Sequence, residues 1–223
     1  MTKENQLKNV YLPTEIETFK FLGDNAFTNC VYLENININK NGLLNDNITY
    51  MGQYCFGWST AIGEVSIQNQ PMKVKINKLP SKLKYLKSGA FYSSGINANI
   101  NISILPENLT TLESWTFYNC PNVNIAEFGS STIGKGLSTI APAALYSAGS
   151  SISTIYINKS IVALGTSQDN NFIPHGAFSN YAVSPLSSIV FYKPINEISN
   201  LNGEPLSRDT INVIGINVEK VSV

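Results

Sequence analysis

A small residue followed by a large apolar residue recurs along the chain at nearly regular intervals. The pairs are Ala26-Phe27, Cys55-Phe56, Ala90-Phe91, Thr116-Phe117, Ala144-Leu145 and Ala177-Phe178. Their second members lie 29, 35, 26, 28 and 33 residues apart. A period near 30 is typical of proteins built from stacked structural repeats. The pattern therefore predicts about six repeated units.

Each pair is followed by apolar residues in the order apolar-x-x-apolar-x-apolar. The last two positions of this pattern are Ile36/Ile38, Val65/Ile67, Ile100/Ile102, Ala126/Phe128, Ile155/Ile157 and Ile189/Phe191. They mostly alternate with polar residues, as the two faces of a half-buried strand require. We therefore predict one short strand downstream of every pair.

A second apolar step lies upstream of each pair. It consists of Phe19/Leu22, Ile48/Met51, Leu83/Leu86, Leu109/Leu112, Leu137/Ile140 and Ile161/Leu164. In the sixth unit the polar stretch 165–171 follows this step before Ile173 resumes the pattern, which indicates an inserted loop. Leu-Pro dipeptides open several units, and proline there prevents the preceding turn from continuing as a helix.

One unit cannot bury both its strand and its phenylalanine turn, so neighbouring units must stack into a common core. We predict a mainly β solenoid of about six coils, with short strands and little helix, over residues 12–192. Residues 1–11 are predicted to form an N-terminal lead or cap. Residues 193–223 are predicted to form a C-terminal cap of β type, in which the alternating segment from Ile211 to Val223 supplies one or two last strands.

Two stretches point to a known family. LPSKLKYLKSGAFYSSG (79–95) and LPENLTTLESWTFYNCPNV (105–123) resemble the leucine-rich repeats of the BspA or Treponema type. The resemblance covers about residues 12–192 and implies a leucine-rich-repeat solenoid. Repeats of this kind serve as binding scaffolds in otherwise unrelated proteins, so the resemblance implies an interaction but names no partner.

Charge and composition exclude several partners. Charged residues make up 13% of the chain, about half the roughly 25% of an average domain. Asparagine, serine and threonine must therefore supply much of the polar surface. The net charge is zero and Arg208 is the only arginine, which disfavours nucleic acid. We expect no membrane insertion and no export signal, because long apolar runs are missing. The final location stays open, with assembly into a virion or at a surface as possibilities.

Few residues suggest chemistry. Cys30 and Cys120 follow the repeat phenylalanine by three positions, and Cys55 occupies the small position of a pair, so we expect free thiols that fill the interior. His175, the sole histidine, has few carboxylates near it in sequence. We predict no catalytic residue, no metal site and no cofactor.

The run GSSTIGKG (129–136) approaches the spacing of a phosphate-binding loop. It lacks the Ser or Thr that this loop needs at position 136, and Pro142 interrupts the helix that should follow. We interpret the run as a glycine-rich turn.

The outward positions of the predicted strands are the candidate contact sites. They are polar at the N-terminal end, where Asn37 and Asn101 lie, and aromatic towards the C-terminal end, at Tyr156 and Tyr192. Phe172 lies beside the inserted loop. Exposed aromatic groups next to polar donors suit a protein or glycan contact. The alternative is that these aromatic residues pack under the loop or the C-terminal cap.

Two functional hypotheses follow. The first is a non-catalytic interaction or structural subunit that binds a protein partner or copies of itself in a larger assembly, such as a phage virion, a tail or a surface complex. The second is a cell-surface adhesin or glycan-binding module, which the family resemblance implies. An enzyme is not expected, because the four aspartates form no spaced pair of acids.

Overall fold

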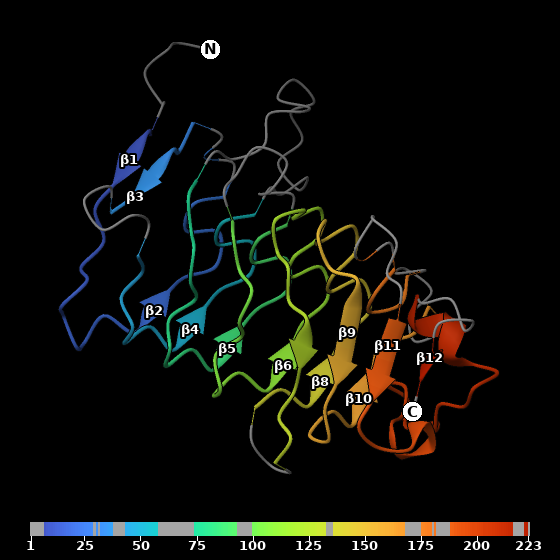
Figure 1. Cartoon of the computed structure of the whole chain (residues 1–223). Helices are drawn as coiled ribbons and strands as arrows, with labels where there is room; N and C mark the ends of the chain where they lie inside the picture. Colours follow the sequence, from blue (N-terminus) through green and yellow to red (C-terminus); the bar gives the residue numbers. More distant parts are fainter. Residues whose placement is uncertain are drawn as a thin grey trace.

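The chain forms a row of stacked coils, seen in a computed structural model (Figure 1). The structure describes residues 7–28, 30, 32–37, 43–57, 74–92, 100–132, 136–167, 175–179, 181, 188–215 and 221–222. Its elements are β1 (Asn9–Val10), β2 (Phe21–Leu22), β3 (Asn35–Ile36), β4 (Tyr50–Met51), β5 (Tyr85–Leu86), β6 (Thr111–Leu112), β7 (Glu127–Phe128), β8 (Thr139–Ile140), β9 (Thr154–Ile157), β10 (Ala163–Leu164), β11 (Ser188–Phe191), η3 (Ile195–Glu197), η4 (Ile211–Ile214) and β12 (Val221–Ser222). The predicted mainly β leucine-rich-repeat solenoid is confirmed.

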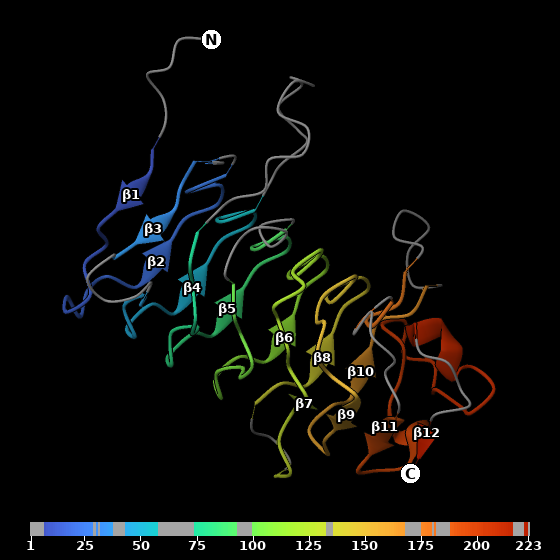
Figure 2. The ribbon, with the colours of Figure 1, turned by 45° about the horizontal axis from the view of Figure 1, so that its top comes forward.

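All strand pairs among the described residues are parallel, and the strands form two rows. The first row, which we call the upstream sheet, contains the hydrogen-bonded sets β2-β4-β5 and β6-β8-β10. The second row, the downstream sheet, contains β1-β3 and β7-β9-β11-β12. Figure 2 shows the upstream strands following one another along the solenoid. The sequence predicted the downstream strands, whereas the upstream strands were not expected.

A column of stacked phenylalanine rings runs through the interior. The ring centroids of Phe27, Phe56, Phe91 and Phe117 lie 5.1, 5.7 and 5.5 Å apart in that order, with planes 11–12° apart. Backbone hydrogen bonds set this spacing, because the Phe56 N–H donates to the Ala90 carbonyl at 2.9 Å and the Phe91 N–H to that of Thr116 at 2.9 Å. The small-large pairs of the sequence are therefore the contact between coils.

The residue before five of the six small-large pairs adopts a left-handed backbone. The φ angles are 57° at Asn25, 48° at Tyr54, 64° at Gly89, 59° at Trp115 and 54° at Ala143. This conformation costs non-glycine residues about 1–2 kcal/mol. It recurs because the chain reverses at the same point of these five coils and so delivers the next large side chain to the interior.

The N-terminal region contains two features that the sequence pattern did not predict. β1 lies within residues 1–11 and pairs with β3, so it forms the first rung of the downstream sheet. In the second unit, Val74 and Ile76 are fully buried, and Ile76 bridges to Ile100. The expected Val65/Ile67 strand lies outside the described residues.

The C-terminal region continues the path of the coils. Ser199 bridges to Ala163, the Phe178 N–H donates to the Ile214 carbonyl at 2.8 Å, and β12 extends the downstream sheet beside β11. The last strand was predicted. However, Ile211–Ile214, expected as strand, forms the 3-10 helix η4, because buried residues three positions apart share one face of such a helix.

Candidate interaction surface

Three aromatic side chains project from neighbouring strands of the upstream sheet. In β2, β4 and β5 the second residue is buried, so the first residue, which is Phe21, Tyr50 or Tyr85, points outward. Ring centroids lie 5.9 Å apart for Phe21 and Tyr50 and 6.2 Å apart for Tyr50 and Tyr85. Phe21 is 65% exposed and Tyr85 58%. We call these three residues the aromatic column.

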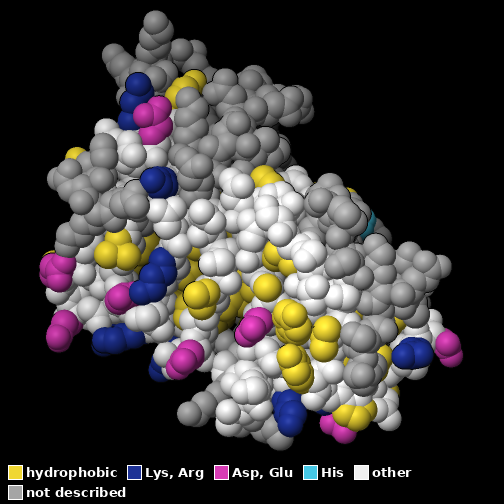
Figure 3. Space-filling model, in the orientation of Figure 1, with side chains coloured by type: hydrophobic (Ala, Val, Ile, Leu, Met, Phe, Trp, Pro, Cys, Tyr) yellow, Lys and Arg dark blue, Asp and Glu magenta, His cyan; other side chains and the backbone are white. Residues whose placement is uncertain are grey.

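Charged groups surround the aromatic column. Exposed Lys20 and Lys84 each precede one of its members and form no ion pair within the described part of the chain. The Tyr50 hydroxyl approaches Asp24 at 3.4 Å, and the pKa of this tyrosine is raised by desolvation and by that carboxylate. Figure 3 shows apolar patches bordered by lysine and acidic side chains on the face of the molecule that is towards the viewer in Figure 1. The surface therefore combines apolar anchors with charges of both signs.

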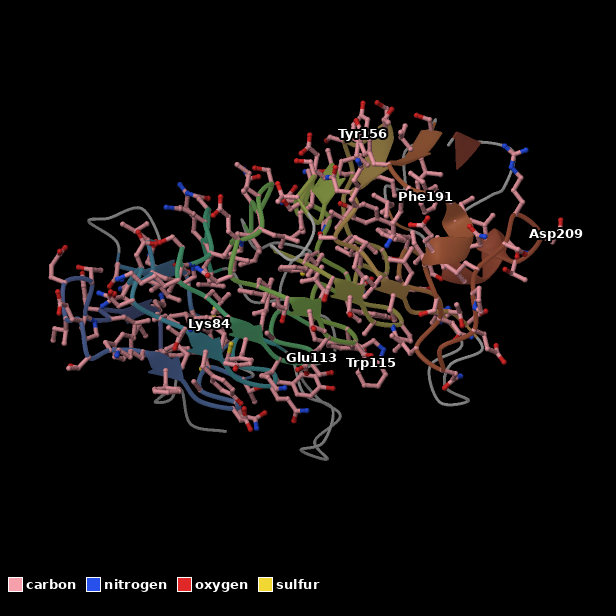
Figure 4. All side chains as sticks on the ribbon, turned by 90° about the horizontal axis from the view of Figure 1, so that it is seen from below. Lys84, Glu113, Trp115, Tyr156, Phe191 and Asp209 are labelled. Carbon is pink, nitrogen blue, oxygen red and sulfur yellow. The ribbon has the colours of Figure 1, made fainter. Side chains whose placement is uncertain are left out.

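An ion pair fixes the next coil beside this column. Lys87 pairs with Glu113, whose second oxygen accepts the Ser88 N–H at 2.9 Å. The hydrogen bond from Lys87 to Glu113 raises the pKa of the lysine. Figure 4 shows Lys84, Glu113 and Trp115 on the same side of the solenoid, with Tyr156 on the other side. Because the pair joins two coils, it holds the surface beside the column in a fixed register.

A second aromatic row lies at the turns. The rings of Tyr92, Tyr118 and Tyr146 stack at 4.6 and 4.8 Å, and His175 continues the row at 4.4 Å from Tyr146. All four side chains are partly buried. Burial is the main cause that raises the pKa of Tyr92 and Tyr118. These rings pack mainly against one another, so the row stiffens the turns and offers a partner less surface than the aromatic column does.

The comparison with known families decides what kind of solenoid this is. The sequence profile of the BspA type leucine rich repeat region matches residues 2–77 and 72–168, in six copies. The matched residues make up more than half of the chain. The chain belongs to this family. Leucine-rich repeats of this type are protein-interaction scaffolds and are typically non-catalytic. Neither the curated proteins nor the solved structures contain a match.

Two of the predicted contact residues of this BspA-type chain come together. The rings of Tyr156 and Tyr192 lie 6.1 Å apart with planes 28° apart, because β9 and β11 pair in parallel with Tyr156 opposite Val190. Tyr192 is 51% exposed and Tyr156 is partly buried. They belong to the downstream sheet, away from the aromatic column. Phe172, predicted beside them, lies outside the described residues.

The two predicted asparagines have different environments. Asn101 is exposed, as expected. The expectation that Asn37 points outward is wrong, because it is only 4% exposed. Its side-chain oxygen accepts the Leu12 N–H at 2.7 Å and its amide donates to the Leu43 carbonyl at 2.7 Å. A left-handed φ of 51° turns this side chain into the protein.

The cysteines, which are the most reactive side chains in the sequence, occupy structural positions of the repeat. All three cysteines are free; Cys55 and Cys120 are fully buried and Cys30 partly so. Desolvation raises the pKa of the Cys55 thiol well above its usual range, which suppresses its reactivity. The described residues contain no cluster of metal-binding side chains and no helix long and apolar enough to span a membrane.

The glycine-rich run has a structural explanation at its first residue. Gly129 has a φ of 82°, and a Cβ there would lie 2.5 Å from the Ser160 hydroxyl. That hydroxyl accepts the Ser130 N–H and donates to the Leu137 carbonyl. Residues 133–135 lie outside the described part. The glycine therefore makes room for a buried hydroxyl that joins two coils.

The aromatic column was missed at the sequence level. The upstream apolar step was not recognised as a strand. The two residues between its apolar positions were therefore not assigned to the core or to the surface. A signal was present, since an aromatic residue immediately precedes the second apolar residue in the first three units, at Phe21, Tyr50 and Tyr85.

Proposed function

We propose that this chain is a non-catalytic binding subunit that holds a protein partner on its upstream sheet. The observation that carries the proposal is the aromatic column, in which rings from three successive coils face outward 5.9 and 6.2 Å apart. Large aromatic side chains are the usual anchors of protein interfaces, because they bury much apolar area with few rotatable bonds. Their regular spacing suits an extended partner segment lying along the solenoid.

The charges beside the column indicate the chemistry of that partner. Lys20 and Lys84 flank its two outer members, and neither forms an ion pair with another described residue. A partner with apolar side chains and flanking carboxylates would complement this surface, and the charges would guide its approach more than they would add affinity. We further propose that the complex is part of a larger assembly, in which a rigid solenoid acts as a spacer with a binding face.

A photocrosslinking experiment tests the binding face. p-Benzoylphenylalanine replaces Tyr85 in one protein and Tyr192 in a matched protein, and both are irradiated in an extract of the source cells. We expect one discrete crosslinked protein at position 85 and none at position 192. Crosslinking at position 192 alone, or at neither position, would contradict the proposal.

Affinity for the crosslinked protein then tests the column itself. Loss of an interface anchor typically costs about 2 kcal/mol or more, so Tyr85→Ala should weaken binding at least about thirtyfold in titration calorimetry. The matched variant Tyr192→Ala should bind as the wild type does. Equal losses from both variants would remove the assignment to the upstream sheet.

A second candidate function rests on the Tyr156–Tyr192 pair. Two nearly parallel rings on the downstream sheet, one of them half exposed, resemble a platform for the apolar face of a sugar. Under this alternative the chain is an adhesin or glycan-binding module. Tyr192→Ala should then abolish binding on a glycan array, while Tyr85→Ala leaves it intact. An empty array for the wild-type protein would contradict it.

A further inference from the structure

The upstream sheet is interrupted between β5 and β6. The strands β2, β4 and β5 form one hydrogen-bonded set, and β6, β8 and β10 form another. β5 and β6 lie side by side (Figure 1), yet no backbone hydrogen bond joins these two described strands. The junctions on either side are regular, since the Tyr85 N–H donates to the Thr49 carbonyl at 3.1 Å and the Thr139 N–H to the Thr110 carbonyl at 3.2 Å. The junction between β5 and β6 therefore differs from its neighbours.

The sequence accounts for missing links in the segment that leads into each strand. In the second coil, which carries β4, the side chain of Asp46 accepts the Ser81 N–H at 2.9 Å and its carbonyl accepts the Lys82 N–H at 3.3 Å. In the third coil, which carries β5, the corresponding position is Ser81, because both residues lie two before the first residue of the upstream apolar step. The structure shows no hydrogen bond between Ser81 and the described segment 103–108 of the fourth coil. A serine side chain is too short to replace the carboxylate that connects the second coil to the third.

A groove lies at the same junction. It has a volume of 390 Å³ and is lined by residues of the segments 77–81 and 103–108. Ile104, one of its lining residues, is 79% exposed, more than any other large apolar residue in the described part of the chain. Packing still holds the adjoining strands, since Leu86 of β5 and Leu112 of β6 are buried in the common core. Apolar contacts have no preferred direction, so they tolerate a rotation that a row of hydrogen bonds would prevent.

The stretch without backbone hydrogen bonds is fixed at both of its ends. Before it, the Asn101 N–H donates to the Ile76 carbonyl at 2.9 Å. After it, the Gly89 N–H donates to the Ser114 carbonyl at 3.0 Å, next to the ion pair of Glu113. Two fixed points define an axis of rotation. The side of the junction that carries the groove can therefore open and close while these two points stay in place.

We propose that this junction is a hinge. The coils up to β5 and the coils from β6 onward move as two blocks about the axis through the two fixed points. Rotation in one direction widens the groove, and rotation in the other brings the facing edges of β5 and β6 to hydrogen-bonding distance. A hinge needs only a few residues and leaves the packing within each block intact. All three residues of the aromatic column lie in the first block, so the proposed binding face stays rigid while the spacer bends behind it.

Spin labels test the hinge in the whole chain. Cys30 is replaced by Ser, and the other two cysteines are fully buried. Labels at Lys84→Cys and Ser138→Cys span the junction, whereas labels at Thr110→Cys and Val162→Cys take the same strand positions, also two coils apart, within the second block. Electron paramagnetic resonance should give a distribution of distances at least about twice as wide for the first pair as for the second. Equal widths would overturn the proposal.

Two carboxylate substitutions test what limits the motion. Glu113→Ala removes the ion pair beside one fixed point and should widen the distribution across the junction further. Asp46→Ala removes a side-chain link between the second and third coils, where β4 and β5 remain hydrogen-bonded. Labels at Lys20→Cys and Lys84→Cys should therefore keep a narrow distribution in that variant. Circular dichroism confirms that each variant folds. A wider distribution for Asp46→Ala, or an unchanged one for Glu113→Ala, would count against the hinge, and neither result depends on the proposed partner.

Discussion

At the scale of single residues, side chains that join two coils contribute to stability out of proportion to their size. Asn37 connects the backbone of Leu12 to that of Leu43 from a nearly fully buried position. Asn37→Ala would remove the side-chain partner of the Leu12 N–H and of the Leu43 carbonyl, so we expect a loss of about 1–2 kcal/mol in the free energy of unfolding. Asn101→Ala, at an exposed residue, should stay within about 0.5 kcal/mol. Urea denaturation measures both, and equal effects would contradict the distinction.

Glycines separate the cost of the left-handed backbone from the cost of crowding. Gly23 lacks a left-handed φ and has open space where a Cβ would be added. Gly203 has a φ of 86° and also has open space there. Gly89 has a φ of 64°, and a Cβ added to it would overlap the Tyr54 ring. Replacement by alanine should be nearly neutral at Gly23, cost about 1 kcal/mol at Gly203 and at least about 2 kcal/mol at Gly89. Thermal unfolding gives the order, and a Gly203 variant as unstable as the Gly89 variant would refute the role of the ring.

At the scale of elements, the sequence predicts the repeat better than the strands. The small-large pairs are visible because one large apolar residue per coil, a phenylalanine in five of the six, packs into the interior. The upstream strands have only two residues each, which is too short for alternation to distinguish a strand from a turn. Asn37 was misplaced for a related reason, since a single left-handed residue reverses the direction of a side chain and leaves no periodic trace in the sequence.

The phenylalanine column gives a prediction for the element scale. Phe91 is fully buried between Phe56 and Phe117, and hydrogen bonds on both sides prevent the coils from closing around a gap. Phe91→Ala should therefore cost about 3–5 kcal/mol. Phe27 is only partly buried and has a ring partner on one side, so Phe27→Ala should cost less than half as much. Guanidinium denaturation compares them, and equal losses would mean that the column does not act through stacking.

At the scale of the whole molecule, stability should vary along the solenoid, because each coil contacts only its neighbours. The C-terminal coils are covered by the segment with η3 and η4, whereas no described strand pairs with the outer edges of β1 and β2. Local opening should therefore begin at the N-terminal end. We expect amide hydrogen exchange to be fastest near β1 and β2 and slowest near β8. Uniform exchange along the chain would contradict sequential opening.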